Sequence, residues 1–314
     1  MGLKVIVTGG AGYVGTAVVE ALQRDIRVEK VLVYDCLIRN DRRFFFQTAG
    51  GLLLDKVQFI KGDILNTEKL QSACEGMDAL VHLAAFVDEP FRHSQHVQYD
   101  QINTYGSLSV VRALEQRSEI EKVVNLSSSA VWGFRSDIKL SDEPNPQNGY
   151  ATSKRRGELY FEKLLDADSA RVKTLRAAHI YGFNRAMRFD TLVHSFLFEA
   201  MTGGRIEIFG NGEQIRPFIH IDKVAASIVD EVFGHSSAQG ELLADFQCDI
   251  NSLLQWVLSR FKEIEYRYLT PSAEHPSQSF SHLSGFDHHD LDRALLSFQN
   301  AMTMNHDCVE NNLT

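Results

Sequence analysis

A glycine-rich turn between a short apolar run and an amphipathic stretch constrains the fold of this 314-residue chain more than any other feature. The turn reads Thr8-Gly9-Gly10-Ala11-Gly12-Tyr13-Val14-Gly15, which fits both G-x-G-x-x-G and G-x-x-G-x-x-G spacing. Glycine at these positions permits a tight turn, close approach of the backbone to a pyrophosphate, and close packing of a helix on a strand. The free N–H groups at the start of the following helix then favour phosphate charge. The turn therefore predicts a dinucleotide-binding β–α unit.

Asp35 ends the second apolar run, twenty residues after Gly15. A carboxylate at this distance accepts hydrogen bonds from the adenine ribose of a bound dinucleotide. It also repels a 2′-phosphate, so the sequence favours NAD over NADP as cofactor. The alternative interpretation is an ordinary glycine turn followed by a capping aspartate.

Short apolar runs alternate with longer amphipathic stretches over the first 180 residues. We expect strands at residues 4–7, 31–34, 57–60, 79–82, 122–126 and 172–175. We expect helices at residues 14–24, 67–74, 103–116 and 150–165. This alternation predicts an α/β fold with a Rossmann-like, doubly wound parallel sheet.

The pattern loosens after residue 180, which predicts a smaller C-terminal substrate-binding lobe. We expect an NAD-binding domain at 1–180, with about 218–247 returning to it, and a lobe built from 181–217 and 248–314. Helices are expected at 191–201, 222–232 and 251–261, a strand at 205–209, and a loop at 181–190. From Ser272 onward Ser, His and Asn dominate, so we expect little regular structure there and a frayed end.

Composition excludes several functional classes. The 32 basic and 41 acidic side chains leave a net charge of −9, which disfavours nucleic-acid binding. No apolar run approaches the ~20 residues of a membrane span, so we expect no membrane partner. The four cysteines form no CxxC pair, which disfavours a disulfide framework and favours a reducing, cytoplasmic location. No metal site is expected, because no compact zinc spacing relates the C-terminal histidines, which are His275, His282, His288, His289 and His306.

Tyr150 and Lys154 are spaced so that they share one face of the expected helix at 150–165. An ammonium that close would lower the pKa of the phenol from its reference value of ~10. Such a tyrosine can exchange a proton with a substrate hydroxyl while hydride moves to or from nicotinamide. Ser127-Ser128-Ser129 ends the fifth strand, at the sheet edge where such sites form. The alternatives are an ordinary surface pair and a polar turn that caps a helix.

Seven segments in chain order carry a resemblance to a known family. They are residues 8–15, Asp35, Gly62-Asp63-Ile64, 82–85, 127–133, Tyr150 with Lys154, and 216–222. Together they resemble the extended short-chain dehydrogenases/reductases of the NAD-dependent nucleotide-sugar epimerase/dehydratase family. The resemblance covers about residues 3–232 and implies a nucleotide-sugar substrate.

The resemblance also implies residue roles. The residues expected to hold the pyrophosphate are Gly9, Gly12, Tyr13, Val14 and Gly15. Asp35 is expected at the adenine ribose, and Asp63 and Ile64 beside the adenine. The residues expected to line the cofactor beneath the fourth strand are Leu83, Ala84 and Ala85. Tyr150 would be the acid/base, with Lys154 tuning it and holding the nicotinamide ribose. Ser128, rather than Ser129, would be the catalytic serine, because it lies five residues before Gly133.

The expected substrate-binding residues are Phe86, Ser128, Tyr150, His179, Arg188, Phe189 and Arg216. Arg216 would bind the nucleotide's phosphates, since its fork suits phosphate oxygens. His179 replaces an Asn found in many relatives and would contact phosphate or substrate, or pack within its loop. Arg188 is a phosphate candidate, whereas Phe189 would pack either on the base or in the core.

Two departures narrow the implied chemistry. The family's 4,6-dehydratases carry Asp-Glu directly after the catalytic residue, where this chain has Ser129 and Ala130. Decarboxylating members carry a glutamate where Ala130 stands. The remaining chemistry favours epimerisation, with C4 as the expected carbon, through a transient keto sugar. The alternatives are a ketoreductase or dehydrogenase, and a non-catalytic NAD-binding regulatory protein.

The resemblance further implies a homodimer that packs through the helices at 103–116 and 150–165. Their apolar faces could equally be monomer core.

Overall fold

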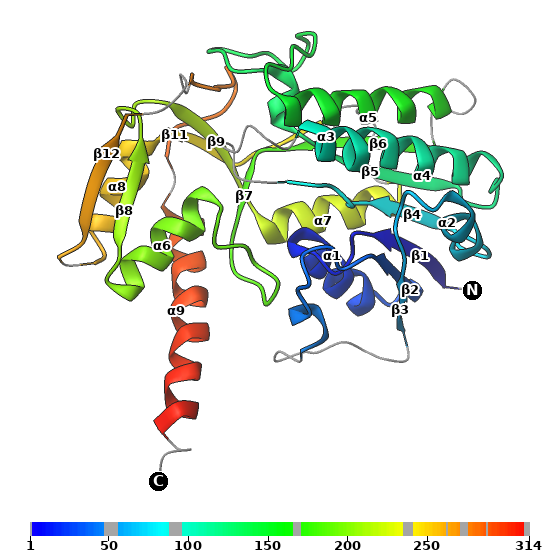
Figure 1. The fold of residues 1–314 in the computed structure, drawn as a ribbon, viewed down its shortest axis with the longest axis horizontal. Helices are drawn as coiled ribbons and strands as arrows, with labels where there is room; N and C mark the ends of the chain where they lie inside the picture. The colour runs from blue at the N-terminus through cyan, green and yellow to red at the C-terminus, as the bar shows by residue number, and fades with distance from the viewer. Residues whose placement is uncertain are drawn as a thin grey trace.

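A computed structural model describes residues 2–46, 56–87, 96–165, 171–234, 241–261, 263–270, 276–286 and 288–310. Figure 1 shows a sheet covered by helices on both faces, next to a lobe that carries the C-terminal helix. This arrangement confirms the predicted fold class.

The central sheet has seven strands in the order β10-β6-β5-β4-β1-β2-β3. The strands are β1 (Leu3–Thr8), β2 (Val28–Asp35), β3 (Val57–Lys61), β4 (Ala79–His82), β5 (Lys122–Ser128), β6 (Val172–Ala177) and β10 (Glu241–Leu243). Every neighbouring pair is parallel. The strand order reverses between β1 and β4. In open α/β sheets, ligands bind in the crevice at such a point, at the carboxyl ends of the strands.

Alternating apolar residues of the strands attach a helical layer to each face of the sheet. Val5 and Val7 of β1 belong to the core cluster that includes residues of α1 (Tyr13–Arg24) and α7 (Ile221–Val232). Ile6 belongs to the opposite cluster, with residues of α2 (Thr67–Ala73), α4 (Gly106–Glu115) and α5 (Gly149–Leu165). This two-sided burial explains the continuous apolar runs of the strands.

The stretch expected as one helix at 103–116 has two parts. A π-helical segment, η3 (Tyr99–Tyr105), follows α3 (His96–Gln98) and leads directly into α4. Single π-helical turns inside helices are rare and often occur at functional sites.

The C-terminal lobe is built on two small sheets. In the first, β9 (Ile215–His220) lies between the parallel β7 (His179–Tyr181) and the antiparallel β11 (Phe246–Asp249). In the second, β8 (Arg205–Phe209) pairs in parallel with β12 (Glu265–Leu269). The accompanying helices are α6 (Leu192–Thr202), α8 (Ile250–Leu258) and α9 (His289–Glu310). The predicted domain boundaries remain a proposal, although β10 and α7 do pack with the first sheet.

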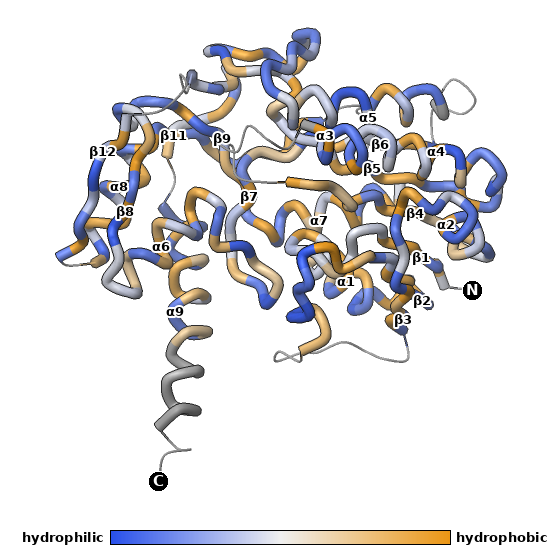
Figure 2. Tube along the Cα trace, in the orientation of Figure 1, coloured by the Kyte–Doolittle hydropathy of each residue, from blue (hydrophilic) through white to orange (hydrophobic). Residues whose placement is uncertain are grey.

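The expectation of little regular structure after Ser272 is wrong for α9. Its residues Leu291, Ala294, Leu295 and Phe298 are buried. They recur at the spacing of one helix face, so this stripe was readable in the sequence. Figure 2 shows hydrophobic and hydrophilic residues alternating along the part of α9 nearest α6.

The structure adds two findings on membranes and metals. None of the described helices is long and apolar enough to cross a bilayer. No group of three His, Cys, Asp or Glu residues among the described residues is arranged to hold a metal ion. His275, and the side chain of His306, lie outside the described residues.

Candidate active site

The glycine turn packs directly against the end of β4. Gly9 has φ +69°, and its N–H donates to the carbonyl of Tyr34 at 2.9 Å. A Cβ on Gly9 would lie 2.6 Å from the Ala84 backbone, and one on Gly15 would overlap the Gly9 carbonyl. Gly12 begins α1 without any side-chain cap. The turn therefore leaves the helix N-terminus free, which fits a pyrophosphate.

Asp35 is held by the glycine turn itself. Its Oδ2 accepts from the Ala11 N–H at 3.1 Å and its Oδ1 from the Leu37 N–H at 2.8 Å. Burial raises the pKa of this carboxyl, and the two backbone hydrogen bonds oppose the rise. Each carboxylate oxygen keeps lone-pair capacity for ribose hydroxyls, so the residue suits the role predicted for it.

The side chains of two expected cofactor-binding residues, Tyr13 and Ile64, make contacts within the protein. The Tyr13 hydroxyl donates to the carbonyl of Gly182 at 2.6 Å, and Ile64 is buried in the core. Only the backbone groups of Tyr13 and Ile64 are therefore left to bind a cofactor. Asp63 is exposed, and its Oδ1 accepts from the Leu65 N–H at 2.9 Å. Val14 is partly buried against the core.

The segment after β4 forms the wall of the crevice beside the turn. Leu83 continues the strand, with its N–H donating to the Thr8 carbonyl at 3.0 Å, and Leu83, Ala84 and Ala85 are half-buried. Phe86 follows, and Asn103 holds its backbone at both ends. The Phe86 N–H donates to Asn103 Oδ1 at 2.7 Å, and Asn103 Nδ2 donates to the Phe86 carbonyl at 3.0 Å.

The structure separates the two candidate serines at the end of β5. Ser128 is half-buried, its hydroxyl accepts from the Ala130 N–H at 3.2 Å, and it lowers the pKa of the Tyr150 phenol. Ser129 is buried, and its hydroxyl donates to Oε1 of Gln278 at 3.0 Å. The position next to Tyr150 is therefore held by Ser128, which supports its predicted role.

The expected electrostatic effect of Lys154 on Tyr150 is not found. The pKa of Tyr150 is raised, chiefly because surrounding protein removes water from the phenol. The Ser128 side chain and the charge of Arg188 oppose that rise in pKa, whereas Tyr99 adds to it. Lys154 instead donates to the Leu126 carbonyl at 2.6 Å. Burial lowers the pKa of Lys154 to about 8, and Glu158 partly offsets this shift.

The π-helical segment supplies two residues that the sequence reasoning missed. The Tyr99 ring lies 5.6 Å from the ring of Phe86 and 5.8 Å from that of Tyr150. Asn103, besides holding Phe86, donates to the Ser153 hydroxyl at 3.0 Å. A signal for Asn103 existed, because it is a polar residue on the buried face that continues through Val110. A buried polar side chain needs partners.

The predicted substrate-binding residues Arg188 and Phe189 make different contacts, although they are neighbours in the chain. The Arg188 guanidinium bonds both carboxylate oxygens of Asp190 and acts on Tyr150. Phe189 packs instead with Phe198 of α6 and Phe298 of α9, at 5.1 and 6.0 Å between ring centroids.

Two further predicted substrate-binding residues, His179 and Arg216, lie on β7 and β9. Arg216 donates to the carbonyls of Ile215 and Pro276, both at 2.8 Å, and burial lowers its pKa to about 10. His179 is reached by solvent, yet the protein atoms around its ring and the charge of Arg216 lower its pKa to about 4. A neutral imidazole beside an arginine is compatible with binding an anion.

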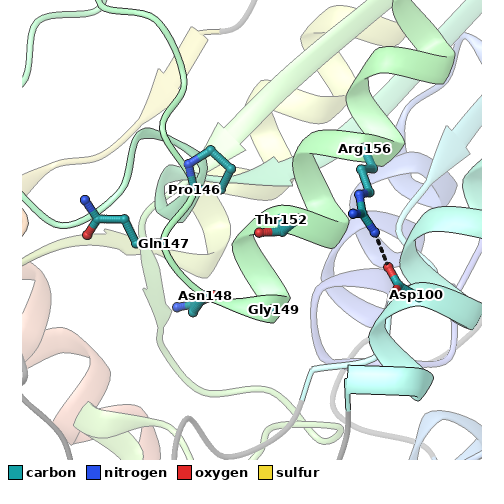
Figure 3. A pocket seen from close by; sticks show the side chains of 7 residues that line it. All are labelled: Asp100, Pro146, Gln147, Asn148, Gly149, Thr152 and Arg156. Carbon is teal, nitrogen blue, oxygen red and sulfur yellow. Dashed lines mark hydrogen bonds and ion pairs between the residues drawn. The ribbon is translucent and has the colours of Figure 1, made fainter.

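A surface hollow of about 440 Å³ opens beside the start of α5 (Figure 3). Thr152 and Arg156 line it, and Arg156 pairs with Asp100 at 2.9 Å. These residues lie two positions beyond Tyr150 and Lys154, on another face of the helix. The hollow contains none of the predicted site residues, so it is separate from the candidate active site.

Comparisons with known proteins agree with this arrangement. A family model described as the NAD dependent epimerase/dehydratase family matches residues 5–232. A dTDP-glucose 4,6-dehydratase of Mycobacterium tuberculosis is 25% identical over 236 residues, which cover 70% of this chain and 66% of that protein.

Two solved structures share the whole fold. One is a UDP-N-acetylglucosamine 4-epimerase from Methanobrevibacter ruminantium in complex with UDP-N-acetylmuramic acid. It is 25% identical, with a TM-score of 0.76 over 94% of this chain and 96% of that chain. The other is a UDP-glucuronic acid 4-epimerase from Bacillus cereus in complex with UDP-glucuronic acid and NAD. It is 22% identical, with a TM-score of 0.76 over 94% and 93% of the two chains.

Proposed function

Because the chain belongs to the NAD-dependent epimerase/dehydratase family of enzymes, we propose that it is a nucleotide-sugar epimerase that inverts C4 through a transient keto sugar. The predicted family and its NAD dependence are confirmed. One observation carries the finer proposal. Ser128 lies beside the Tyr150 phenol and lowers its pKa, while positions 129 and 130 offer no carboxylate.

The residues around the crevice fit NAD. The turn at Gly9, Gly12 and Gly15 would hold the pyrophosphate through backbone N–H groups, and Asp35 would hold the adenine ribose. Lys154 would contact the nicotinamide ribose. Bound NAD supplies the acceptor, and later the donor, of the hydride.

Tyr150 moves the proton in this scheme. Its phenolate takes the proton of the sugar's C4 hydroxyl as the C4 hydride leaves, and returns it when hydride comes back to the opposite face. Ser128 would hydrogen-bond the same sugar oxygen and keep it beside the phenol. Burial raises the pKa of Tyr150, so the cation of Arg188 helps to make the phenolate accessible.

A 4,6-dehydratase is the main competing function, since a similar protein of Mycobacterium tuberculosis carries that name. The family resemblance implies an Asp-Glu pair for that chemistry. Here Ser129 is buried against Gln278, and Ala130 has no ionisable group. A missing carboxylate removes the group that would take the C5 proton, which weighs against dehydration.

The nucleotide would lie toward the lobe. Arg216 and His179 would bind the diphosphate, with Arg216 offering its fork to the oxygens. Phe86, which is held by Asn103, would contact the sugar.

The experiment uses purified UDP-, GDP-, CDP- and dTDP-sugars, each incubated with the enzyme and NAD and followed by proton NMR. One of them should give its C4 epimer. Tyr150→Phe should lower turnover about 10²–10⁴-fold, as expected for loss of an acid/base group. Tyr266→Phe, at an exposed tyrosine of the lobe, is the matched control. Full turnover by Tyr150→Phe would refute the mechanism.

A homodimer through η3, α4 and α5 is a further part of the proposal. Large apolar side chains are exposed on this side of the fold, with Tyr105 57% and Leu159 42% exposed. Covering them would remove apolar surface from water. Light scattering should give twice the chain mass, and Leu159→Glu should shift the protein toward monomer. A monomeric parent protein would contradict this proposal.

We also place the protein in a reducing cytoplasm. The four cysteines form no CxxC pair, which favours that location.

A further inference from the structure

The strand β12 lies at the outer margin of the C-terminal lobe (Figure 1). It pairs in parallel with β8, and no other strand among the described residues pairs with its second edge. Four of its five residues, 265 to 268, are exposed. An open edge of this kind presents unpaired N–H and C=O groups, with which a further strand can pair.

One hydrogen bond shows which backbone groups face the open edge of β12. The Gly210 N–H donates to the Leu269 carbonyl at 2.9 Å, so the backbone groups of Leu269 point toward β8. The direction of these groups alternates along a strand, so those of residues 267 and 265 also point toward β8. The N–H and C=O groups of Tyr266 and Tyr268 therefore point outward.

The side chains of β12 form a charged face and an aromatic face. On the charged face, Glu265 pairs with Arg205 of β8 at 2.8 Å, and Arg267 pairs with Glu207 of β8. The two tyrosines lie on the opposite face, with 6.2 Å between their ring centroids. They are 46% and 49% exposed, so about half of each remains available for contact with another molecule.

A second copy of β12 fits this edge when Tyr266 lies on a twofold axis. In antiparallel pairing, Tyr266 is then opposite itself, and Tyr268 is opposite Ile264 of the second copy, the residue that directly precedes the strand. The outward N–H and C=O groups meet in this arrangement and exchange hydrogen bonds. It also places aromatic rings opposite aromatic and β-branched side chains, which stabilises cross-strand pairs.

Charge selects this register over the neighbouring ones. With Tyr266 on the axis, Glu265 lies opposite Arg267 of the second copy, at a position where cross-strand side chains come close. Unlike charges are favourable there, and like charges are unfavourable. An axis at Arg267 would place two arginines opposite each other, and an axis at residue 268 would remove both unlike pairs. The selected register extends the ion pairs of each chain into one row of alternating charge.

We propose that β12 is a docking edge for a second copy of this chain: two β12 strands pair antiparallel about Tyr266 and join two two-stranded sheets into one. This contact is separate from the helices η3, α4 and α5, through which the homodimer is proposed to form. Because β12 has only five residues, the contact is small, and small interfaces are weak. It should therefore join homodimers to one another, at high protein concentration.

Disulfide trapping tests the register. In the proposed pairing, the Cα atoms of two Tyr266→Cys residues lie about 5.5 Å apart, a distance that a disulfide spans. Tyr268→Cys is the matched control on the same edge, because its two copies lie about 13 Å apart along the strands. Under mild oxidation at high protein concentration, Tyr266→Cys should cross-link about tenfold faster than Tyr268→Cys on non-reducing gels. The parent protein gives the background from the native cysteines.

Charge reversal tests the unlike pairs. Glu265→Arg and Arg267→Glu each place like charges opposite each other between two copies. Each variant alone should self-associate about tenfold more weakly than the parent, measured by sedimentation equilibrium from about 10 μM to 1 mM. An equimolar mixture of the two should recover the parental affinity, because unlike charges then face each other in both pairs. Arg205→Gln breaks an ion pair within one chain only and should keep the parental association.

Three results would overturn the inference. A mass that stays constant over the whole concentration range would mean that β12 does not pair with its own copy, which leaves the edge to an extended segment of another protein. Equal cross-linking of Tyr266→Cys and Tyr268→Cys would refute the register. A mixture of the two charge variants that associates no better than either alone would refute the charge pairing. These measurements are independent of turnover and of the helix-packed homodimer.

Discussion

The parallel sheet and the C-terminal lobe hold their parts of the active site by different means. In the region of the parallel sheet, the backbone itself forms the site, because Gly9 and Gly15 lie against neighbouring backbone with no room for a side chain. In the lobe, buried polar side chains bind backbone groups far away in sequence. Gln278, which donates to the carbonyls of Ser129 and Gly133, is the main example. The first region should therefore be sensitive to added atoms, and the second to lost hydrogen-bonding groups.

Gly9→Ala tests the first half of this comparison and should have the largest effect on stability. A positive φ and the backbone of Ala84 at 2.6 Å both oppose a Cβ. We expect the free energy of unfolding to fall by about 4 kcal/mol, measured by urea denaturation. Gly76→Ala is the matched control, since Gly76 has φ +68° but nothing within 4 Å. Its loss should be about 1 kcal/mol. Equal losses at both positions would show that close packing of the turn is unimportant.

Gln278→Leu tests the second half. The amide of Gln278 donates to the carbonyls of Ser129 and Gly133, both at 2.8 Å, and is buried. Leucine leaves those carbonyls without this donor, so unfolding free energy should fall by about 3 kcal/mol. Turnover should fall as well, because Ser128 precedes the released segment. Gln71→Leu, at a half-buried glutamine whose amide donates to the exposed side chain of Gln116, should change little. A Gln278→Leu protein with parental stability would contradict the account of the lobe.

Lys154→Met tests a residue that does not follow this division, because Lys154 belongs to the sheet region and yet its polar side chain is buried. The folded-state pKa of Lys154 is lowered to about 8, below its value in an unfolded chain. Between these two pKa values the unfolded chain binds more protons, so stability rises with pH. Removing Lys154 should reduce the gain between pH 8 and pH 10 by about 2 kcal/mol. Denaturation at both pH values measures it, with Lys69→Met as control. An unchanged gain would mean that Lys154 is not desolvated as described.

The same division explains how much could be predicted from the sequence. The strands, the glycine turn and Asp35 depend on local spacing, which a single sequence displays, whereas the choice of Ser128 came from the family resemblance. The π-helical turn has no local signal, and neither does the contact of Gln278 with Ser129 and Gly133. The opposed effects on Tyr150 could not be foreseen, because the ammonium of Lys154 turns to Leu126 and Arg188 arrives from a distant loop.

The lobe's last helix is a different case. Leu291, Ala294, Leu295 and Phe298 form a regular stripe that the polar composition around it concealed. Periodicity, rather than average composition, was the better guide there.

Proton NMR of the reaction in D₂O tests the central claim most directly. If the C4 hydride leaves and returns within one active site, the inverted product must carry hydrogen, not deuterium, at C4. The account predicts a new C4 epimer with that proton fully retained and no net consumption of NADH. Deuterium on a sugar carbon, or an accumulating keto sugar that has lost its 6-hydroxyl, would contradict it.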